Sequence, residues 1–266
     1  MAVKLGVIGG GTMGRAIVAG CLDAGVLRAG EVLVAEVDPD RWQEIAALGV
    51  RVTGDAAVTR AATQIMLAVK PQSFPGVAAA LGTLAESKVV ISIMAGLTSA
   101  RIRAALGPRA RVVRVMPNTP CRIRAGMAAI ALGDGARRGD EALAVEIFNA
   151  LGRTLMVNEA DLHAVTAVSG SGPAYVFLLA EAMEQAALEL GLSAEQAAIL
   201  VRQTILGSGR LLVESGEPPE ALRAAVTSPG GTTEAALALM QRRGLPSIVA
   251  EAISAAAQRA QQLDEG

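Results

Sequence analysis

Short apolar runs alternate with segments of helical periodicity along the first 116 residues. The runs at 3–8, 32–36, 65–69, 89–93 and 112–116 are apolar almost throughout, as expected of parallel strands that are buried on both faces. Between them, helical periodicity with credible ends predicts helices at 12–24, 39–48, 74–84 and 99–106. Alternation of strand and helix predicts an α/β fold built on a doubly wound parallel sheet.

The pattern changes near residue 160. Residues 126–132 and 154–157, with a helix at 140–151 between them, are expected to extend the sheet. Beyond them no convincing strand follows, and helices are predicted at 161–190, 194–215, 219–226, 233–243 and 246–263. The chain is therefore expected to contain two domains, an α/β domain at 1–159 and an all-α domain at 160–266, which also suits its length.

Composition narrows the possible partners. Apolar residues make up 52% of the chain but aromatic residues only 2%, so Ala, Val, Leu and Ile must build the core. The net charge is −1 and no five or six like charges follow one another, which argues against nucleic-acid binding. Cys21 and Cys121 lack metal-ligand spacing, so no metal or disulfide framework is expected. The N-terminal apolar run is too short for a signal peptide, and no clean membrane span is evident; a soluble, cytoplasmic protein is expected.

A glycine-rich turn follows the first predicted strand. In GVIGGGTMG, Gly9, Gly11 and Gly14 have GxGxxG spacing, and the motif opens a helix, which is the context that dinucleotide binding requires. Gly9 permits the tight turn, Gly11 lets a pyrophosphate approach the backbone, and Gly14 lets the helix pack on the strand. Free amides at the helix start then bind the phosphates. A Rossmann-type sheet that binds NADPH or NADH is predicted.

Three further segments face the same predicted edge of the sheet. Glu36 ends the second strand, where an acid usually binds ribose hydroxyls and repels a 2′-phosphate; Asp38 and Arg41 are alternatives, and Arg41 could pair with that phosphate. Lys70, in LAVKP, ends the third strand and is one of three lysines in the chain; without its context, solvated surface is the favoured interpretation. Residues 94–96 end the fourth strand, where small side chains would let a nicotinamide approach.

The chain contains few groups that could move a proton. His163 is its one histidine, and no lysine follows Lys88, so the helical domain cannot supply the lysine acid/base of a hydroxyacid dehydrogenase. A surface or capping role is expected for His163. An iminium is already protonated and polarised, so reduction of a C=N bond chiefly needs positioning, a hold on the substrate and exclusion of water. The sequence therefore favours C=N reduction over carbonyl reduction.

Two predicted helix starts could hold a small anion. The first is the run from Ser169 to Gly172 in AVSGSGPAY, and the second is TSPGGTTEAAL, where Thr232 and Thr233 open a helix. Amides, hydroxyls and the helix dipole together suit a carboxylate. Ordinary helix capping accounts for either stretch taken alone.

The chain resembles the pyrroline-5-carboxylate reductase family over essentially its whole length. The resemblance is carried by IGGGTMG, AVKPQ, VRVMPNTP, DLHAVTAVSGSGPAY and VTSPGGTTEAAL. It implies reduction of 1-pyrroline-5-carboxylate to L-proline by NADPH or NADH. It also implies a helical domain that forms an interlocked homodimer, often assembled into a decamer, and a substrate-carboxylate loop that matches residues 228–233.

The predicted site residues follow from the motifs and the resemblance together. Cofactor binding is expected at Gly9, Gly11, Thr12, Met13, Gly14, Glu36, Ala68, Val69, Lys70, Pro71, Met94, Ala95, Gly96 and Glu159. Substrate binding is expected at Ser228, Gly230, Gly231, Thr232, Thr233 and Thr166, with Thr233 near the ring nitrogen, and the catalytic residues are expected to be Thr233 and Ser171.

One departure and three rival functions stay open. Ala56 stands where the family often has an asparagine that contacts the adenosine ribose, which with Glu36 leaves the preference between NADH and NADPH undecided. The rivals are a reductase of another cyclic imine, a hydroxyacid dehydrogenase, and a regulator that binds the dinucleotide without turnover.

Overall fold

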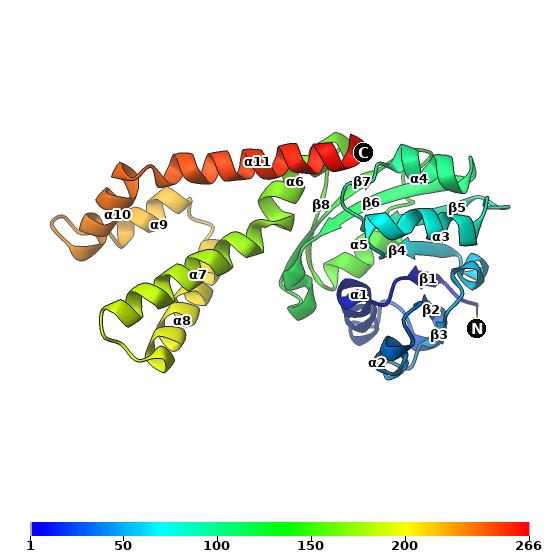
Figure 1. The fold of residues 1–266 in the computed structure, drawn as a ribbon, viewed down its shortest axis with the longest axis horizontal. Helices are drawn as coiled ribbons and strands as arrows, with labels where there is room; N and C mark the ends of the chain where they lie inside the picture. The colour runs from blue at the N-terminus through cyan, green and yellow to red at the C-terminus, as the bar shows by residue number, and fades with distance from the viewer. Residues whose placement is uncertain (1, 266) are drawn as a thin grey trace. The chain divides into compact units, whose positions relative to one another are not determined.

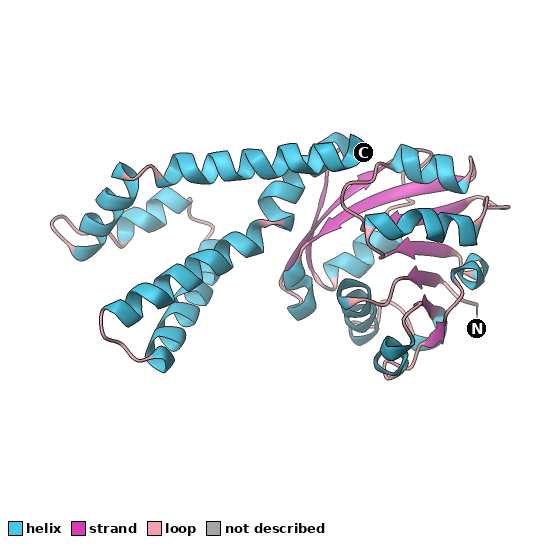
Figure 2. Ribbon diagram, viewed as in Figure 1, coloured by secondary structure: helices cyan, strands magenta, loops and turns pink. Residues whose placement is uncertain are grey.

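A single eight-stranded sheet organises the first part of the chain (Figure 2). The computed structural model describes residues 2–265, and of Glu265 the backbone alone. The strand order is β3–β2–β1–β4–β5–β6–β7–β8. The strands are β1 (Leu5–Ile8), β2 (Val32–Ala35), β3 (Arg51–Thr53), β4 (Gln64–Leu67), β5 (Lys88–Ser92), β6 (Ala110–Pro117), β7 (Gly126–Leu132) and β8 (Gly152–Met156).

The sheet is parallel except where β7 pairs antiparallel with β6. These two strands are joined by a short 3-10 segment, Thr119–Ile123, whereas a parallel pair needs a longer crossover. The predicted doubly wound parallel sheet is confirmed, with this antiparallel pair as an exception. β8 returns to the parallel direction beside β7, because helix α5 (Ala142–Asn149) supplies the crossover between them.

Two local elements differ from the expected pattern. Strand β3 was not predicted, because its three residues are exposed or half-buried at the sheet edge and form no apolar run. The helix expected at 39–48 is a 3-10 turn, Pro39–Arg41, followed by the short helix α2 (Trp42–Ala46).

Two apolar cores lie on opposite faces of the sheet. One packs α1 (Thr12–Asp23), α2 and α5 against the strands, through side chains such as Ile17, Ile45 and Phe148. The other packs α3 (Phe74–Leu81) and α4 (Ser99–Leu106) through Phe74, Leu81 and Leu106. This covering of both faces explains why the central strands are apolar along their whole length.

The helix expected at 161–190 has an interruption. It consists of α6 (Leu162–Val165), a π-helical turn (Thr166–Gly170) and α7 (Gly172–Glu189). Pro173 has no N–H to donate to the carbonyl of Ser169, four residues earlier. That carbonyl instead accepts a hydrogen bond from the side-chain amide of Asn118 at 3.3 Å. The turn closes through the Ser171 N–H, which donates to the Thr166 carbonyl at 2.8 Å.

The described chain divides into two units. The first comprises residues 1–171 and 256–266, and the second comprises residues 172–255. The second unit holds α7, α8 (Ala194–Glu214), α9 (Pro219–Ala225), α10 (Thr232–Arg242) and the start of α11 (Leu245–Glu265). The end of α11 belongs to the first unit and lies beside α6 (Figure 1).

Candidate functional site

A cleft of about 1000 Å³ opens at the carboxyl edge of the sheet. Its walls come from the ends of β1, β2, β4, β5 and β6, including Ile8, Ala35, Ala68, Ile93 and Pro117. Strand order reverses between β1 and β4, and ligands of open α/β sheets bind at such a switch point. The fold therefore places the cleft where the glycine motif predicts a dinucleotide.

The close backbone packing of the glycine turn requires glycine at two of its positions. Gly9 has φ +105°, and a Cβ there would lie 2.5 Å from the Ala68 carbonyl oxygen. A Cβ on Gly14 would lie 2.1 Å from the Gly9 carbonyl oxygen, so Gly14 is required for α1 to pack against the turn. The first α1 amide with an intrahelical acceptor is Arg15, which donates to Gly11. The amides of residues 12–14 are therefore free of helical partners, as pyrophosphate binding requires.

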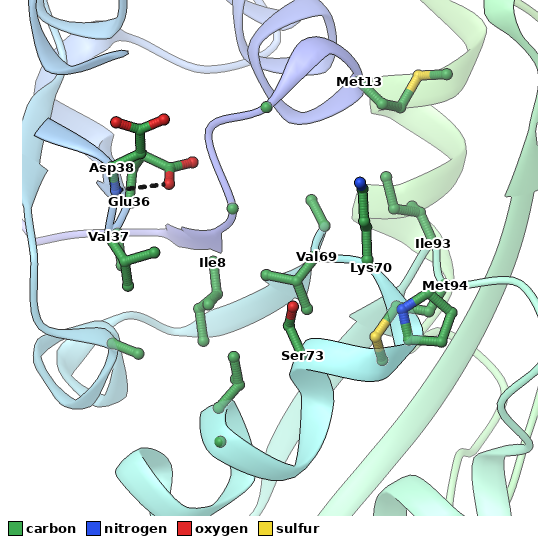
Figure 3. Close-up of a pocket in the computed structure, with 18 of the residues that line it drawn as sticks. Ile8, Met13, Glu36, Val37, Asp38, Val69, Lys70, Ser73, Ile93 and Met94 are labelled. Atoms are coloured by element: carbon green, nitrogen blue, oxygen red, sulfur yellow. Dashed lines mark hydrogen bonds between the residues drawn. The ribbon is translucent and has the colours of Figure 1, made fainter. Parts of the chain in front are cut away.

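Glu36 is buried at the end of β2 with both oxygens engaged. Its Oε2 accepts from the Gly10 N–H at 2.7 Å, and its Oε1 accepts from the Asp38 N–H at 3.0 Å (Figure 3). Arg41 lies beside it, with Nη1 3.8 Å from Glu36 Oε2 and Nε 3.1 Å from Asp38 Oδ2. One carboxylate thus links the glycine turn to the loop after β2, and the nearby guanidinium is shared by two acids.

The opposite part of the cleft is more apolar. Val69, Ile93 and Met94 point into it, and the Lys70 side chain extends between Val69 and Ile93 (Figure 3). Among the predicted cofactor residues, those lining the cleft are Gly9, Gly11, Thr12, Met13, Glu36, Ala68, Val69, Lys70, Pro71, Met94 and Ala95.

Three predicted cofactor residues lie outside the lining. Gly14 supports the turn from behind. Gly96 has φ +67°, and a Cβ there would lie 2.7 Å from the Leu263 Cβ. Glu159 accepts a hydrogen bond from the Ser99 N–H at 2.7 Å and lies 3.2 Å from Arg114 Nη1. Gly14 and Gly96 are near neighbours of lining residues in the chain, whereas Glu159 contacts Ser99 and Arg114, which do not line the cleft.

Sequence reasoning missed several lining residues. Asp55 lines the cleft, as does Ala56, which the resemblance had matched to a ribose-contacting position, and the Asp55 side chain accepts from the Ala57 N–H at 2.8 Å. Met116 and Pro117 line it from the end of β6. The position of 116–117 at the end of a predicted strand was the available signal, because the four other strands predicted within the first 116 residues already carried a site residue at or just after their ends.

The 228–233 loop belongs to the second unit. Gly230 has φ +69°, and its N–H donates to Glu234 Oε2 at 2.7 Å. One amide of the loop is therefore already bonded to a carboxylate of the chain. The hydroxyls of Thr232 and Thr233 have no hydrogen bond within the described chain, and their N–H groups precede the first bonded amide of α10, that of Ala235.

The other expected anion loop is largely helical. Thr166, Ser169 and Gly170 lie in the π turn, and the Thr166 hydroxyl donates to the Leu162 carbonyl at 2.7 Å. Ser171 joins the turn to α7. A Cβ on Gly170 would lie 2.5 Å from Met116 Cε. Because Met116 lines the cleft, the π turn packs directly behind the cleft wall, and such turns recur at functional sites.

Two family models match the chain. Residues 159–263 match the model described as pyrroline-5-carboxylate reductase dimerisation, and residues 4–96 match the model described as NADP oxidoreductase coenzyme F420-dependent. A pyrroline-5-carboxylate reductase from Synechocystis sp. is 39% identical over 99% of both chains, and one from Escherichia coli is 35% identical over the full length of both. The chain belongs to the pyrroline-5-carboxylate reductase family.

Solved structures of this family have the same fold. A pyrroline-5-carboxylate reductase from Coxiella burnetii superposes with a TM-score of 0.91 at 35% identity, covering 99% of both chains. The Plasmodium falciparum enzyme, solved with NADP bound, gives 0.88 at 30% identity over 98% of both chains. A reductive aminase from Aspergillus terreus, at 17% identity, shares the fold alone.

Proposed function

We propose that this protein reduces 1-pyrroline-5-carboxylate to L-proline with NADH or NADPH. Full-length membership in the family carries the proposal, at 39% identity over 99% of the chain. The cleft agrees with it, because a turn that no Cβ could occupy at Gly9 or Gly14 lies at the switch point of the sheet. A hydroxyacid dehydrogenase and a non-catalytic binder do not account for this family membership.

The cleft residues fit a nicotinamide dinucleotide. The bound cofactor supplies the hydride. The amides of residues 12–14 would hold the pyrophosphate, and Glu36 would accept from the adenosine ribose hydroxyls. We infer a preference for NADH, because a 2′-phosphate would lie against a buried carboxylate. Arg41, the cation that could offset this, is already paired with Asp38 and Glu36. Ala56 adds no hydrogen-bonding side chain.

The substrate residues are part of the same proposal. Thr232 and Thr233 would bind the substrate carboxylate through their unpartnered amides and hydroxyls, with Ser228, Gly230 and Gly231 setting the loop. Thr233 would lie nearest the ring nitrogen. Thr166 and Ser171 would act from the π turn. Because the iminium is already protonated, these groups would orient the ring and exclude water.

Assembly and location complete the proposal. The α/β part at 1–159 would bind the cofactor, and the helical part at 160–266 would form a homodimer, on which a decamer is built. One described stretch, Glu159–Glu189, is long and apolar enough to cross a membrane, but length and composition alone do not distinguish it from a helix of a soluble protein. We place the enzyme in the cytoplasm, without membrane or nucleic-acid partners. Among the described residues, no group of three His, Cys, Asp or Glu could hold a metal ion.

Steady-state assays of the purified chain test the function. Cofactor oxidation and proline formation are followed with 1-pyrroline-5-carboxylate and, in parallel, with larger cyclic imines, each with NADH and NADPH. Proline should form with the highest kcat/KM on 1-pyrroline-5-carboxylate. Turnover of only a larger imine would replace this substrate with the rival one.

A further inference from the structure

The end of the last helix lies directly behind one wall of the cleft. The loop after β5 contributes Ile93, Met94 and Ala95 to the lining, and in the proposed function this part faces the nicotinamide. The next residue, Gly96, packs against the end of α11, since a Cβ there would lie 2.7 Å from the Leu263 Cβ. The position of residues 94–96 therefore depends on where α11 ends.

Asp264 connects the end of α11 to three other elements, β6, α6 and α4. Its carboxylate is 7% exposed, and Oδ2 lies 3.5 Å from Arg114 Nη1 on β6 and 3.4 Å from His163 Nε2 on α6. Its backbone carbonyl accepts from Arg101 Nη1 of α4 at 3.2 Å. The helix end is thus tied to elements that surround the loop.

Arg114 connects this anchor to the far end of the same loop. Its side chain is 7% exposed, and Nη1 lies 3.2 Å from Glu159 Oε1. Glu159 in turn accepts from the N–H and the hydroxyl of Ser99, the first residue of α4. The Ser99 hydroxyl accepts from the Asp134 N–H at 2.8 Å. One buried guanidinium therefore holds, through two carboxylates, both the start of α4 and the support behind Gly96.

The Asp264 contacts are poorly optimised for stability. Its Oδ1 is buried and has no hydrogen-bond partner in the described chain, and its contacts with Arg114 and His163 are longer than good charge-assisted hydrogen bonds. A buried carboxylate with one unpartnered oxygen and only long contacts at the other contributes little net stability. We propose that Asp264 is a positioning residue, which sets the nicotinamide-side wall at 94–96 through Leu263 and Arg114. This rests on the proposed function, in that the cleft binds a nicotinamide dinucleotide.

Binding to the full-length chain tests the proposal without turnover. Calorimetric Kd values for NADH and for ADP-ribose, which lacks the nicotinamide, are compared in Asp264→Asn. Because the loop would face only the nicotinamide end of the ligand, NADH affinity should fall about tenfold while ADP-ribose affinity stays unchanged. Asp264→Glu should recover part of the loss. Glu251→Gln, which removes an exposed carboxylate from the same helix, is the matched control and should bind both ligands normally.

Two outcomes would overturn the assignment: equal losses for both ligands, which indicate a general fold defect, or no loss for either. If Asp264→Asn does not fold, Arg101→Met gives the same comparison, because it removes the hydrogen bond that Arg101 Nη1 donates to the Asp264 carbonyl and leaves the carboxylate contacts in place. Failure of the unmodified chain to bind either ligand would instead refute the proposed function.

Discussion

The two units of this chain differ in where their apolar residues lie. The first unit buries almost all of the core, on both faces of the sheet. In the second unit, residues 172–255, the buried apolar residues are Ala197 and Val201. Large apolar side chains there are exposed instead, among them Phe177, which is 65% exposed, and Ile199, which is 62% exposed.

This difference shows what each unit needs in order to be stable. Exposed apolar area of this extent is uncommon on a monomer and marks an interface. The family model that covers 159–263 is described as a dimerisation domain. We therefore expect the first unit to fold on its own core and the second to depend on a partner chain.

The largest expected effect comes from placing a charge on the exposed apolar surface. Phe177→Glu should abolish the dimer, because losing a buried phenylalanine twice across a two-fold interface weakens association by about 4 kcal/mol, roughly a thousandfold in Kd. Sedimentation velocity measures this directly. Gln203→Glu, which adds the same charge at an exposed polar position of α8, is the control. A dimer that persists in Phe177→Glu would show that α7 does not form the interface.

Apolar periodicity alone could not distinguish the two units. An amphipathic helix has the same sequence pattern whether its apolar face packs against its own chain or against a partner chain. Local sequence patterns predicted the strands around the glycine turn and most helix ends. They could not predict how the helix around Ser169 is interrupted. Its interruption depends on Pro173 and on Asn118, which is 51 residues away from Ser169 along the chain.

The site could be predicted to a similar extent. Strand-end residues such as Glu36 and Lys70 are local features, and they line the cleft. Residues that act from behind the wall are not local. Glu159, Arg114 and Asp264 meet only because β6, the 3-10 turn at Glu159–Asp161 and the end of α11 converge, and no spacing in the sequence signals this. Glu234 was missed for a different reason, since a first-turn acid looks like an ordinary helix charge until its bond to Gly230 is seen.

A second substitution tests whether the second unit binds the substrate and not the cofactor. Thr233→Ala should raise the substrate KM about tenfold or more, because a hydrogen bond to a charged group contributes about 1.5–3 kcal/mol. Cofactor Kd, measured by fluorescence, should stay unchanged. Thr232→Ala is the matched variant and should have the smaller effect if Thr233 lies nearer the ring nitrogen. A changed cofactor Kd with a normal substrate KM would show that the loop serves the other ligand.

A third substitution tests whether Glu36, in the first unit, sets the preference between NADH and NADPH. Glu36→Ser removes the buried carboxylate and leaves Arg41 with Asp38 alone, so the ratio of kcat/KM for NADPH over NADH should rise about tenfold. Because Glu36 also holds the Gly10 amide, affinity for both cofactors should weaken slightly. Asp38→Ser serves as the control for loss of charge at the same loop. An unchanged ratio would remove Glu36 as the selector.

The smallest expected effect concerns Cys21 and Cys121, which report on the first unit. Burial raises the pKa of the Cys21 thiol to about 11 and raises that of Cys121 in the same direction. Thiolate is the form that alkylates, so at pH 8 the Cys21 thiolate is about a thousandth of the total. Because the folded unit favours the neutral Cys21 thiol, the contribution of this thiol to folding stability is present below pH 9 and is lost as pH rises through about 11.

The labelling rates of the two thiols therefore test whether the first unit stays folded without the partner chain. In Phe177→Glu, iodoacetamide should label both cysteines as slowly as in the unmodified protein, because their cover comes from the first unit's own core. Mass spectrometry after timed quenching measures the two rates separately, and urea-unfolded protein gives the upper limit. Rapid labelling of Cys21 in the dissociated chain would mean that the first unit also needs the dimer, and the contrast between the two units would then be one of degree.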